Sequence, residues 1–325
     1  MKAIIISKAG GPEVLKIEDV ESKEPGDNEI VIKVKAAGVN RSDILTRKNP
    51  DAYGSGLDKA IIPGLEVAGE IIKTGSKVAT RKIGDRVCAL IPAGGYAEYV
   101  TIHENLSLPI PGELNYVEAA SLPETVFTVW FNVFQQAYLK KGEKLLIHGG
   151  TSGVGAMGLQ MAKAMGIKTY TTVGSAKKIS FLEDRELGTV INYKEQNFEE
   201  IFKDEKIDVI LDMVGGDYTQ KNLEILNNKG RLVYINGMNG ITPKINLWTI
   251  MSKRLILTGS LLKPQSIEVK SKIAKEVEEQ IWPLLSSKAI KPVVNKTFPL
   301  EEAGKAHSLM ESSEHIGKIV LTIDS

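Results

Sequence analysis

The sequence is poor in the residues that build disulfides and metal sites. Its 325 residues include one cysteine, Cys88, and four histidines, which are scattered at His103, His148, His307 and His315. A single cysteine excludes an internal disulfide framework and a cysteine-rich zinc lobe. The histidines lack the short spacing that metal ligands share, so the sequence predicts no metal site.

The sequence also lacks a net charge and a long apolar run. Lysine and arginine number 41 against 40 aspartates and glutamates, which gives no general reason to expect nucleic acid or a membrane surface as the main partner. No apolar run approaches the length of a membrane span, and residues 1–6 lead into charged residues without the apolar core of a signal peptide. We therefore expect a cytoplasmic globular protein, long enough for two domains.

Residues 1–123 have the pattern of a β-rich domain. Short β-branched and apolar segments alternate with turns such as Gly10-Gly-Pro12 and Pro25-Gly-Asp27. Several short strands at this spacing favour a barrel or sandwich. The expected strands lie at residues 3–6, 14–17, 29–35, 67–72, 86–90 and 97–101.

Residues 124–265 change to alternating strands and helices, which predicts an α/β fold with a doubly wound parallel sheet. Residues 266–325 contain an amphipathic helix at 270–287 that Pro283 interrupts, a helical stretch at 301–312, and a strand at 317–323 that we expect to return to the first domain. The strands of the parallel sheet are expected at 145–147, 168–173, 190–192, 208–212, 231–235 and 255–260.

A glycine-rich turn follows the first strand of this sheet. Gly149, Gly150, Gly153 and Gly155 separate the strand from a helical segment at 156–165. The N-terminus of such a helix offers free N–H groups and a positive dipole end to a pyrophosphate. The spacing departs from the G-x-G-x-x-G dinucleotide fingerprint, and such a turn also serves tight packing alone. The order strand, turn, helix, strand favours the dinucleotide interpretation.

The residues after the second strand of the sheet indicate which nicotinamide cofactor fits. An NAD site usually has an acidic residue about 20 residues beyond the glycines, where it accepts hydrogen bonds from the ribose. This chain instead has Gly174-Ser-Ala-Lys-Lys178, and its next acidic residue is Glu183. Ser175 and Lys178 can bind a 2′-phosphate that a carboxylate would repel, so the sequence favours NADPH. Ser175 can also cap a helix, and the two roles are compatible.

Taken together, these residues resemble the zinc-free quinone oxidoreductases of the medium-chain dehydrogenase/reductase superfamily, and most closely the p53-inducible-type subgroup. The resemblance runs essentially from end to end, and its pieces are specific in combination. They are Gly11-Pro-Glu13, Gly38-Val-Asn-Arg-Ser-Asp43, Pro63-Gly-Leu-Glu66, Gly95-Tyr-Ala-Glu-Tyr99, Glu124, Thr128, the turn from His148 to Gly155, Gly174 to Lys178, Asn192-Tyr193, Gly215-Gly216, Asn222 and Ile316-Gly-Lys-Ile-Val-Leu321.

The resemblance implies a GroES-like β-barrel domain followed by a Rossmann domain, with NADPH and substrate bound between them. It also implies a homodimer, formed through edge strands such as residues 255–261. Zinc-dependent relatives carry a cysteine where this chain has Asn40, and Gly-His-Glu where it has Gly64-Leu-Glu66. Leucine cannot ligate a metal, so the resemblance implies a metal-free enzyme.

The resemblance also assigns roles to individual residues. Asn40 and Tyr53 would line the substrate site, and Thr128, near the start of a helix, would contact the nicotinamide end. Tyr193 would reach the 2′-phosphate together with Lys178. The implied cofactor contacts are Gly150, Thr151, Ser152, Gly153, Val154, Gly155, Gly174, Ser175, Lys178, Tyr193, Val214, Gly215, Gly237, Ser260, Leu261 and Lys318.

Plain structural roles stay open for most of these residues. Asn40 also suits a tight turn, Tyr53 a partly exposed loop, Thr128 an ordinary helix position, Tyr193 a strand end, and Lys318 a solvent-facing strand position. We interpret Glu66 as a buried structural acid, and His148 as a strand end with a satisfied hydrogen bond.

Without a metal, the chemistry depends on the orientation of a hydride donor against an acceptor that is already electron-poor. Quinones and enones fit, because conjugation stabilises their reduced products. Asn40 can offer its amide N–H to the acceptor oxygen, and Tyr53 can donate a hydrogen bond. The sequence therefore predicts an NADPH:quinone oxidoreductase. Two alternatives stay open: a double-bond reductase of alkenals, enones or enoyl thioesters with Tyr53 as the acid, and a noncatalytic NADPH-binding protein of the crystallin or RNA-binding kind.

Overall fold

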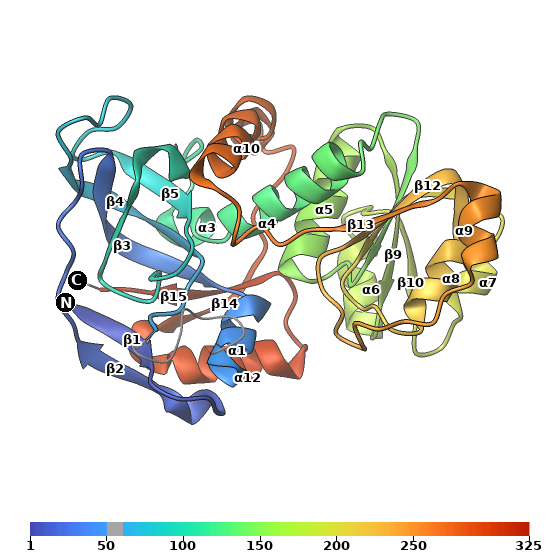
Figure 1. Cartoon of the computed structure of the whole chain (residues 1–325), viewed down its shortest axis with the longest axis horizontal. Helices are drawn as coiled ribbons and strands as arrows, with labels where there is room; N and C mark the ends of the chain where they lie inside the picture. The colour runs from blue at the N-terminus through green and yellow to red at the C-terminus, as the bar shows by residue number, and fades with distance from the viewer. Residues whose placement is uncertain (51–60, 325) are drawn as a thin grey trace. The chain divides into compact units, whose positions relative to one another are not determined.

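The chain folds into two units (Figure 1). The computed structural model describes residues 1–50 and 61–324. Unit 1 comprises residues 1–127, 263–288 and 292–325, and unit 2 comprises residues 128–262 and 289–291. The first boundary follows Phe127, whereas the sequence placed it after position 123. Both positions lie in helix α4 (Pro123–Val129), so the boundary falls within a continuous helix.

Unit 1 is built on a seven-stranded sheet of order β14-β15-β3-β4-β5-β7, in which β6 also pairs with β3. β15 runs antiparallel to β3, with Ile319 opposite Val39, so the end of the chain returns to the first unit. β1 and β2 form a separate antiparallel pair. The strands are β1 (Lys2–Ile6), β2 (Leu15–Asp19), β3 (Glu29–Val39), β4 (Glu66–Thr74), β5 (Arg86–Leu90), β6 (Tyr99–His103), β7 (Ser107–Pro109), β14 (Val294–Pro299) and β15 (Lys318–Thr322).

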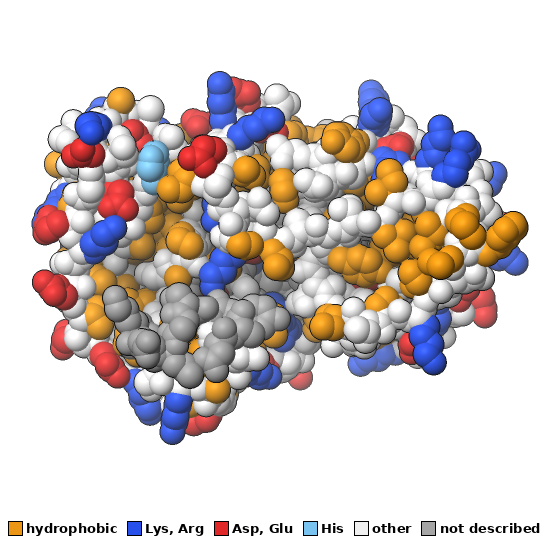
Figure 2. All heavy atoms as spheres, in the orientation of Figure 1, with side chains coloured by type: hydrophobic (Ala, Val, Ile, Leu, Met, Phe, Trp, Pro, Cys, Tyr) orange, Lys and Arg blue, Asp and Glu red, His pale blue; other side chains and the backbone are white. Residues whose placement is uncertain are grey.

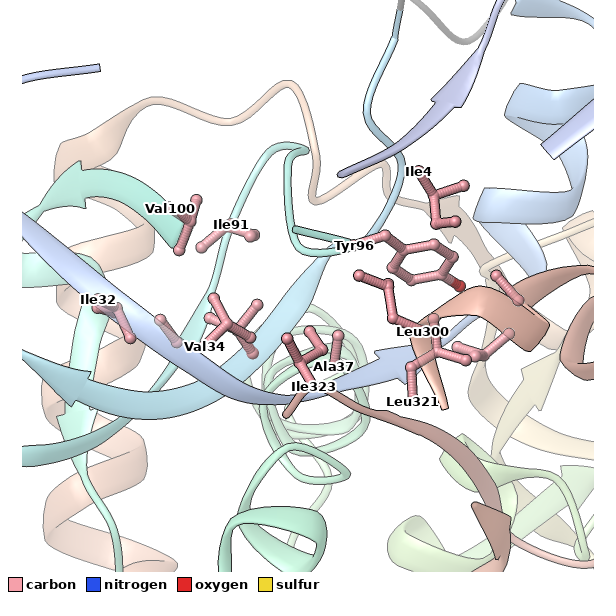
Figure 3. Packing of buried hydrophobic residues seen from close by; sticks show 14 of the residues in the cluster. Ile4, Ile32, Val34, Ala37, Ile91, Tyr96, Val100, Leu300, Leu321 and Ile323 are labelled. Carbon is pink, nitrogen blue, oxygen red and sulfur yellow. The ribbon is translucent and has the colours of Figure 1, made fainter. Parts of the chain in front are cut away.

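The core of unit 1 follows the two-residue period of β3. Ile32 and Val34 point into the core, and a register shift between Val34 and Ala36 then brings Ala37 to the same face. Figure 3 labels these side chains in the core cluster, to which Tyr96 and Leu321 also belong. An alternating apolar strand buries one face in this way, and the shift lets the strand continue past the centre of the sheet without exposing that face.

Two helical stretches were predicted in unit 1, and the structure has helices at both, together with helices that were not predicted. The amphipathic stretch expected at 270–287 is two helices, α10 (Ile267–Gln280) and α11 (Trp282–Ser286), and Pro283 lies in the first turn of the second helix. Proline suits that position because its missing N–H would have no partner there. The others are η1 (Pro12–Val14), α1 (Arg41–Lys48), η2 (Glu104–Leu106), α3 (Tyr116–Ala119), η4 (Leu300–Glu302) and α12 (Ala303–Ser312).

Unit 2 contains the predicted doubly wound parallel sheet. Its strand order is β10-β9-β8-β11-β12-β13, and every neighbouring pair is parallel. Its elements are η3 (a π-helix, Trp130–Gln136), β8 (Lys144–His148), α5 (Gly153–Ala164), β9 (Lys168–Val173), α6 (Ala176–Glu183), β10 (Thr189–Asn192), α7 (Phe198–Phe202), β11 (Ile207–Asp212), α8 (Tyr218–Ile225), β12 (Leu226–Tyr234), α9 (Leu247–Lys253) and β13 (Ile256–Gly259).

The order of this sheet positions the site. The chain starts in the middle at β8, moves outward through β9 and β10, and then returns to the other side of β8 at β11. The connections therefore leave β8 and β11 in opposite directions. Ligands of doubly wound sheets bind outside the carboxyl ends of the strands at such a reversal.

Candidate cofactor and substrate site

The glycine-rich turn lies at the carboxyl end of β8, in the middle of the sheet. A Cβ on Gly150 would come within 2.1 Å of Thr171 Oγ1, and one on Gly155 within 2.3 Å of the Gly149 carbonyl. Only glycine fits such close approaches. Ser152 is the N-cap of α5, and its Oγ accepts a hydrogen bond of 3.0 Å from the Gly155 N–H. The turn therefore delivers the N-terminus of a twelve-residue helix to this edge of the sheet.

The next strand ends beside a phenol and a lysine. A Cβ on Gly174 would lie 2.5 Å from the Tyr193 hydroxyl, so the Tyr193 ring rests against the glycine backbone. Ser175 stands at the N-cap position of α6, but its side chain makes no capping hydrogen bond. Lys178 follows within the first turn of the same helix. The structure thus brings Gly174, Ser175 and Tyr193 together at the N-terminus of α6.

The other predicted cofactor residues of unit 2 follow β11, β12 and β13 at the same edge. Asp212 Oδ1 accepts hydrogen bonds from the N–H groups of Val214 and Gly215, at 2.6 and 3.2 Å. A Cβ on Gly215 would lie 3.0 Å from the Gly237 Cα, so these two turns touch. Asp212 was not singled out in the sequence, although an acid that ends a buried strand is a recognisable signal for a turn held by its carboxylate.

Two residues follow β13. Ser260 donates a hydrogen bond of 2.8 Å from its Oγ to Asn132 Oδ1, and Leu261 is 69% exposed.

A surface pocket of about 380 Å³ adjoins the Tyr193 side of this edge. It is lined by residues 193–198, which follow β10, and by Tyr218 and Lys221 of α8. Lys221 Nζ lies 6.0 Å from the centre of the Phe198 ring. Tyr218 and Lys221 were missed in the sequence, because nothing local shows that α8 faces the loop after β10.

His148 is buried where β8 ends. Its Nδ1 lies 3.0 Å from Thr172 Oγ1, and its Nε2 lies 2.8 Å from Asn222 Oδ1. Burial lowers the pKa of His148, against the pull of Asp212 and Asn222. The interpretation of this histidine as a hydrogen-bonded strand end is confirmed.

In unit 1, Asn40, Glu66 and Lys318 form one buried cluster. Lys318 Nζ lies 2.5 Å from Glu66 Oε1 and donates hydrogen bonds to Asn40 Oδ1 at 2.6 Å and to the Val39 carbonyl at 3.0 Å. Lys318 is 5% exposed and Glu66 is 0% exposed. Glu66 is therefore the buried structural acid that the sequence suggested, and the alternative of a solvent-facing lysine is wrong for Lys318.

The two other residues that were predicted to be catalytic are Thr128 and Tyr53. Thr128 lies near the end of α4 and not near the start of a helix, and the helical course continues into η3, where Asn132 Nδ2 donates to the Thr128 carbonyl at 2.9 Å. The boundaries of helices are the least reliable part of an assignment from a single sequence. Tyr53 lies outside the described residues.

A second buried hydrogen-bond network contacts the backbone N–H of Asn40. Asp43 Oδ2 accepts hydrogen bonds from the Asn40 N–H at 2.8 Å and from the Tyr96 hydroxyl at 3.1 Å. His307 contacts this hydroxyl through Nε2 at 3.2 Å and Arg47 through Nδ1 at 3.3 Å. Burial raises the pKa of Asp43 to about 6 and lowers that of His307 to about 3. No local pattern indicates this network, because its members come from three distant segments of the chain.

Comparison with known proteins places these features in a family. Residues 26–112 match the alcohol dehydrogenase GroES-like domain, and residues 187–321 match a zinc-binding dehydrogenase model. The mouse quinone oxidoreductase is 32% identical over 99% of this chain and 98% of its own length. The chain belongs to the quinone oxidoreductases of the medium-chain dehydrogenase/reductase superfamily. The predicted GroES-like and Rossmann architecture is confirmed.

Solved structures agree with this family. The Escherichia coli quinone oxidoreductase, whose structure was determined with NADPH, superposes with a TM-score of 0.87, at 29% identity, over 99% of this chain and 100% of that chain. The CurF ER cyclopropanase of curacin A biosynthesis superposes with a TM-score of 0.87, at 25% identity, over 99% of both chains. A quinone oxidoreductase and a cyclopropanase therefore share the fold of this chain.

Within residues 1–50 and 61–324, no group of three or more His, Cys, Asp or Glu side chains is arranged to hold a metal ion. No helix in this part of the chain is long and apolar enough to cross a membrane.

Proposed function

We propose that this protein is an NADPH-dependent, metal-independent reductase that transfers hydride to quinones. The observation that carries the proposal is the edge of the unit 2 sheet, where a turn that admits only glycine at Gly150 and Gly155 lies beside Ser175 and Tyr193. NADPH, when bound, supplies the hydride. The residues of this chain bind and orient the cofactor and the acceptor.

The cofactor contacts are assigned by the chemistry of each residue. The N–H groups at the start of α5 suit the pyrophosphate, and the glycines at 150 and 155 let the turn pack against Thr171 and the Gly149 carbonyl, which brings these N–H groups to the edge of the sheet. Ser175, Lys178 and Tyr193 suit the 2′-phosphate, because they provide hydroxyl donors and a cation. Val214, Gly215, Gly237, Ser260 and Leu261 complete the proposed cofactor contacts.

Zinc does not fit the residues at the positions where related dehydrogenases hold it. Asn40 Oδ1 and Glu66 Oε1 both bind the Lys318 ammonium, at 2.6 and 2.5 Å, and Leu65 has no ligating atom. A zinc ion in this place would put a charge of +2 next to the buried Lys318 ammonium. Although one family model carries zinc in its name, we derive no metal-dependent step for this chain.

Quinones are the proposed acceptors because reduction then needs no Lewis acid. Addition of hydride to a quinone produces an aromatic phenolate, so a nearby hydrogen-bond donor or water completes the reaction. Asn40 is the proposed donor in unit 1, and Tyr53 and Thr128 are the proposed neighbours of the reacting rings. The quinone oxidoreductases of mouse and Escherichia coli, which match this chain over nearly its full length, support this acceptor class.

A double-bond reductase is the second candidate. The similarity to the CurF ER cyclopropanase favours it, because an enoyl-thioester acceptor can use the same hydride donor. Such a reaction must also protonate carbon, which requires an acid such as Tyr53.

We also propose that the protein is a homodimer joined along β13. Within the described residues, β13 pairs with β12 on one side only, so its other side presents unpaired backbone groups. A twofold axis perpendicular to an edge strand places the same strand of a second copy antiparallel to it, which continues the sheet.

The test is NADPH oxidation with an ortho-quinone as acceptor, with NADH and a 2-enal assayed in parallel. Saturable oxidation of NADPH by the quinone, with little oxidation of NADH, supports the proposal. Turnover with the enal alone moves the double-bond reductase to first place. NADPH binding without turnover leads to the noncatalytic alternative, which an RNA filter-binding assay with and without NADPH would examine.

The metal-independent part has its own test. We expect exhaustive chelation to leave the rate unchanged. Loss of activity that added zinc restores would overturn this part of the proposal.

A further inference from the structure

Residues of unit 1 provide the polar contacts of the buried ion pair between Glu66 and Lys318. The three N–H donors of Lys318 have three acceptors within 3.0 Å, namely Glu66 Oε1, Asn40 Oδ1 and the Val39 carbonyl. Glu66 Oε2 accepts a further hydrogen bond of 2.8 Å from the N–H of Glu124, in the first turn of α4. Removal of either charge from such a buried pair leaves the other charge uncompensated, which strongly destabilises the fold.

This pair determines which way the Asn40 amide faces. Asn40 Oδ1 accepts from the Lys318 ammonium, and Asn40 Nδ2 donates to Glu66 Oε1 at 3.0 Å. Rotation of the amide by half a turn would place its NH₂ group against an ammonium and its oxygen against a carboxylate. Both contacts would then be repulsive, and in a buried setting such contacts are costly.

One hydrogen of the amide is held less tightly. Asn40 Nδ2 has a second contact, to the Gly38 carbonyl, at 3.4 Å, which is at the long limit for a hydrogen bond. The first N–H is held by the carboxylate, so the second is the one that a substrate oxygen can take over with little loss.

We propose that Glu66 and Lys318 are positioning residues that hold the Asn40 amide with an N–H directed to the acceptor oxygen. This inference rests on the proposed function, in which Asn40 contacts the acceptor. It differs from the expectation that Lys318 contacts the cofactor, because a lysine whose three donors are engaged would have to give up one of these contacts to reach the cofactor.

A kinetic cycle with Lys318→Met and Asn40→Ala separates the two roles of Lys318. If Lys318 acts through Asn40, each single variant lowers kcat by about 10- to 100-fold, the range for a misplaced catalytic group, and the double variant is no slower than Asn40→Ala. The KM for NADPH stays within about twofold of the wild-type value in all three, because uniform binding is unchanged. A rise in this KM in both backgrounds, or additive losses in kcat, would overturn the proposal.

Two further variants distinguish a fall in kcat caused by lost positioning of Asn40 from one caused by a general loss of stability. Glu66→Gln/Lys318→Met replaces the pair by neutral groups of similar size, so no unpaired charge stays buried, and we expect it to fold and to keep the low kcat. Arg231→Met removes the partly buried pair with Glu143 in unit 2, whose N–O distance is 2.7 Å, and we expect it to lose stability with an unchanged kcat. A normal kcat in the neutral double variant would contradict the proposal.

The orientation of Asn40 can also be read without any turnover. The side-chain amide signals of Asn40 are identified in a ¹⁵N-labelled sample as those missing from Asn40→Ala. We expect two well-separated proton shifts that move together in Lys318→Met and in the neutral double variant. If the amide signals stay unchanged, the ion pair does not hold Asn40, and this conclusion stands even if the wild-type protein reduces no quinone.

Discussion

Single residues decide which cofactor the proposed site prefers. Lys178 and Lys177 are neighbours on α6, but Lys177 is exposed and Lys178 is half-buried. We expect Lys178→Ala to weaken NADPH binding by about 1.5–3 kcal/mol, the range for a hydrogen bond to a charged group, and to leave NADH binding nearly unchanged. Lys177→Ala is the matched control. Titration of both cofactors by fluorescence gives the answer, and equal losses for NADPH and NADH would remove the phosphate assignment.

Two buried residues of unit 1 titrate in opposite senses. Burial raises the pKa of Asp43 from 3.8 to about 6, against the hydrogen bonds from Asn40, Tyr96 and Gly64. The folded protein therefore keeps a proton that the unfolded chain releases, so this group lowers the stability of the fold as pH rises from about 4 to about 6. Burial, and then the charge of Arg47, lower the pKa of His307 from 6.5 to about 3. His307 therefore lowers stability as pH falls from about 6.5 to about 3.

The effects of Asp43 and His307 on stability oppose each other between about pH 4 and about pH 6. Comparison of the wild type with a variant that lacks one of the two groups isolates the contribution of that group. We expect Asp43→Asn to gain stability relative to the wild type as pH rises from about 4 to about 6.5, by up to about 3 kcal/mol, because one pKa unit corresponds to about 1.4 kcal/mol. Urea unfolding of both proteins across this range measures the difference. A difference that is flat, or that shrinks as pH rises, would show that Asp43 is not held protonated by burial.

At the level of the element, two serines occupy the same helix position with different bonds. Ser152 caps α5 with its side chain, whereas Ser175 at the start of α6 makes no such bond. We expect Ser152→Ala to lower the free energy of unfolding by about 1 kcal/mol, as for other lost N-caps, and Ser175→Ala to change it much less. Thermal unfolding compares the two variants.

The two serines should also differ in their effect on the preference for NADPH over NADH. We expect Ser175→Ala to weaken NADPH binding more than NADH binding, whereas Ser152→Ala affects both cofactors alike. An equal loss of stability in both variants would mean that Ser175 also caps its helix.

At the level of the whole molecule, exposed apolar side chains gather on unit 2. Leu247, Trp248 and Met251 of α9 are each more than 60% exposed, and Ile256 of β13 is 53% exposed. Figure 2 shows hydrophobic side chains gathered over the α9 part of this unit. A contiguous apolar surface of this kind commonly marks a protein interface, which agrees with the proposed dimer along β13.

The assembly is tested by a charge on the edge strand. We expect Ile256→Lys to give a monomer, because a lysine on an edge strand opposes strand pairing. Ile83→Lys is the control, since Ile83 is 64% exposed in unit 1 and should leave the mass unchanged. Sedimentation equilibrium reports the mass, and a monomeric wild-type protein or an equal effect of both variants would contradict the proposed interface.

Much of the fold follows from local sequence. The apolar runs at 145–147 and 208–212 specified central strands of a parallel sheet, and the crowded glycines at 149–155 specified the turn between β8 and α5. These signals are local, because strand periodicity and the need for glycine depend on neighbours a few residues away. The strands β7 and β14 were not predicted, since Ser107–Pro109 is short and most of Val294–Pro299 is exposed. Both are strands because of the partners beside them.

The sequence by itself determined the sheet of unit 2, its glycine turn and the residues at its carboxyl edge, because each depends on adjacent positions. Only the tertiary structure decided the surroundings of Asn40. β15 lies between β14 and β3, so both of its edges are paired, and Lys318 on this strand is buried. No strand pattern shows that Lys318 then meets Glu66. Two charges from distant segments come together only when the sheet that carries them has closed around both.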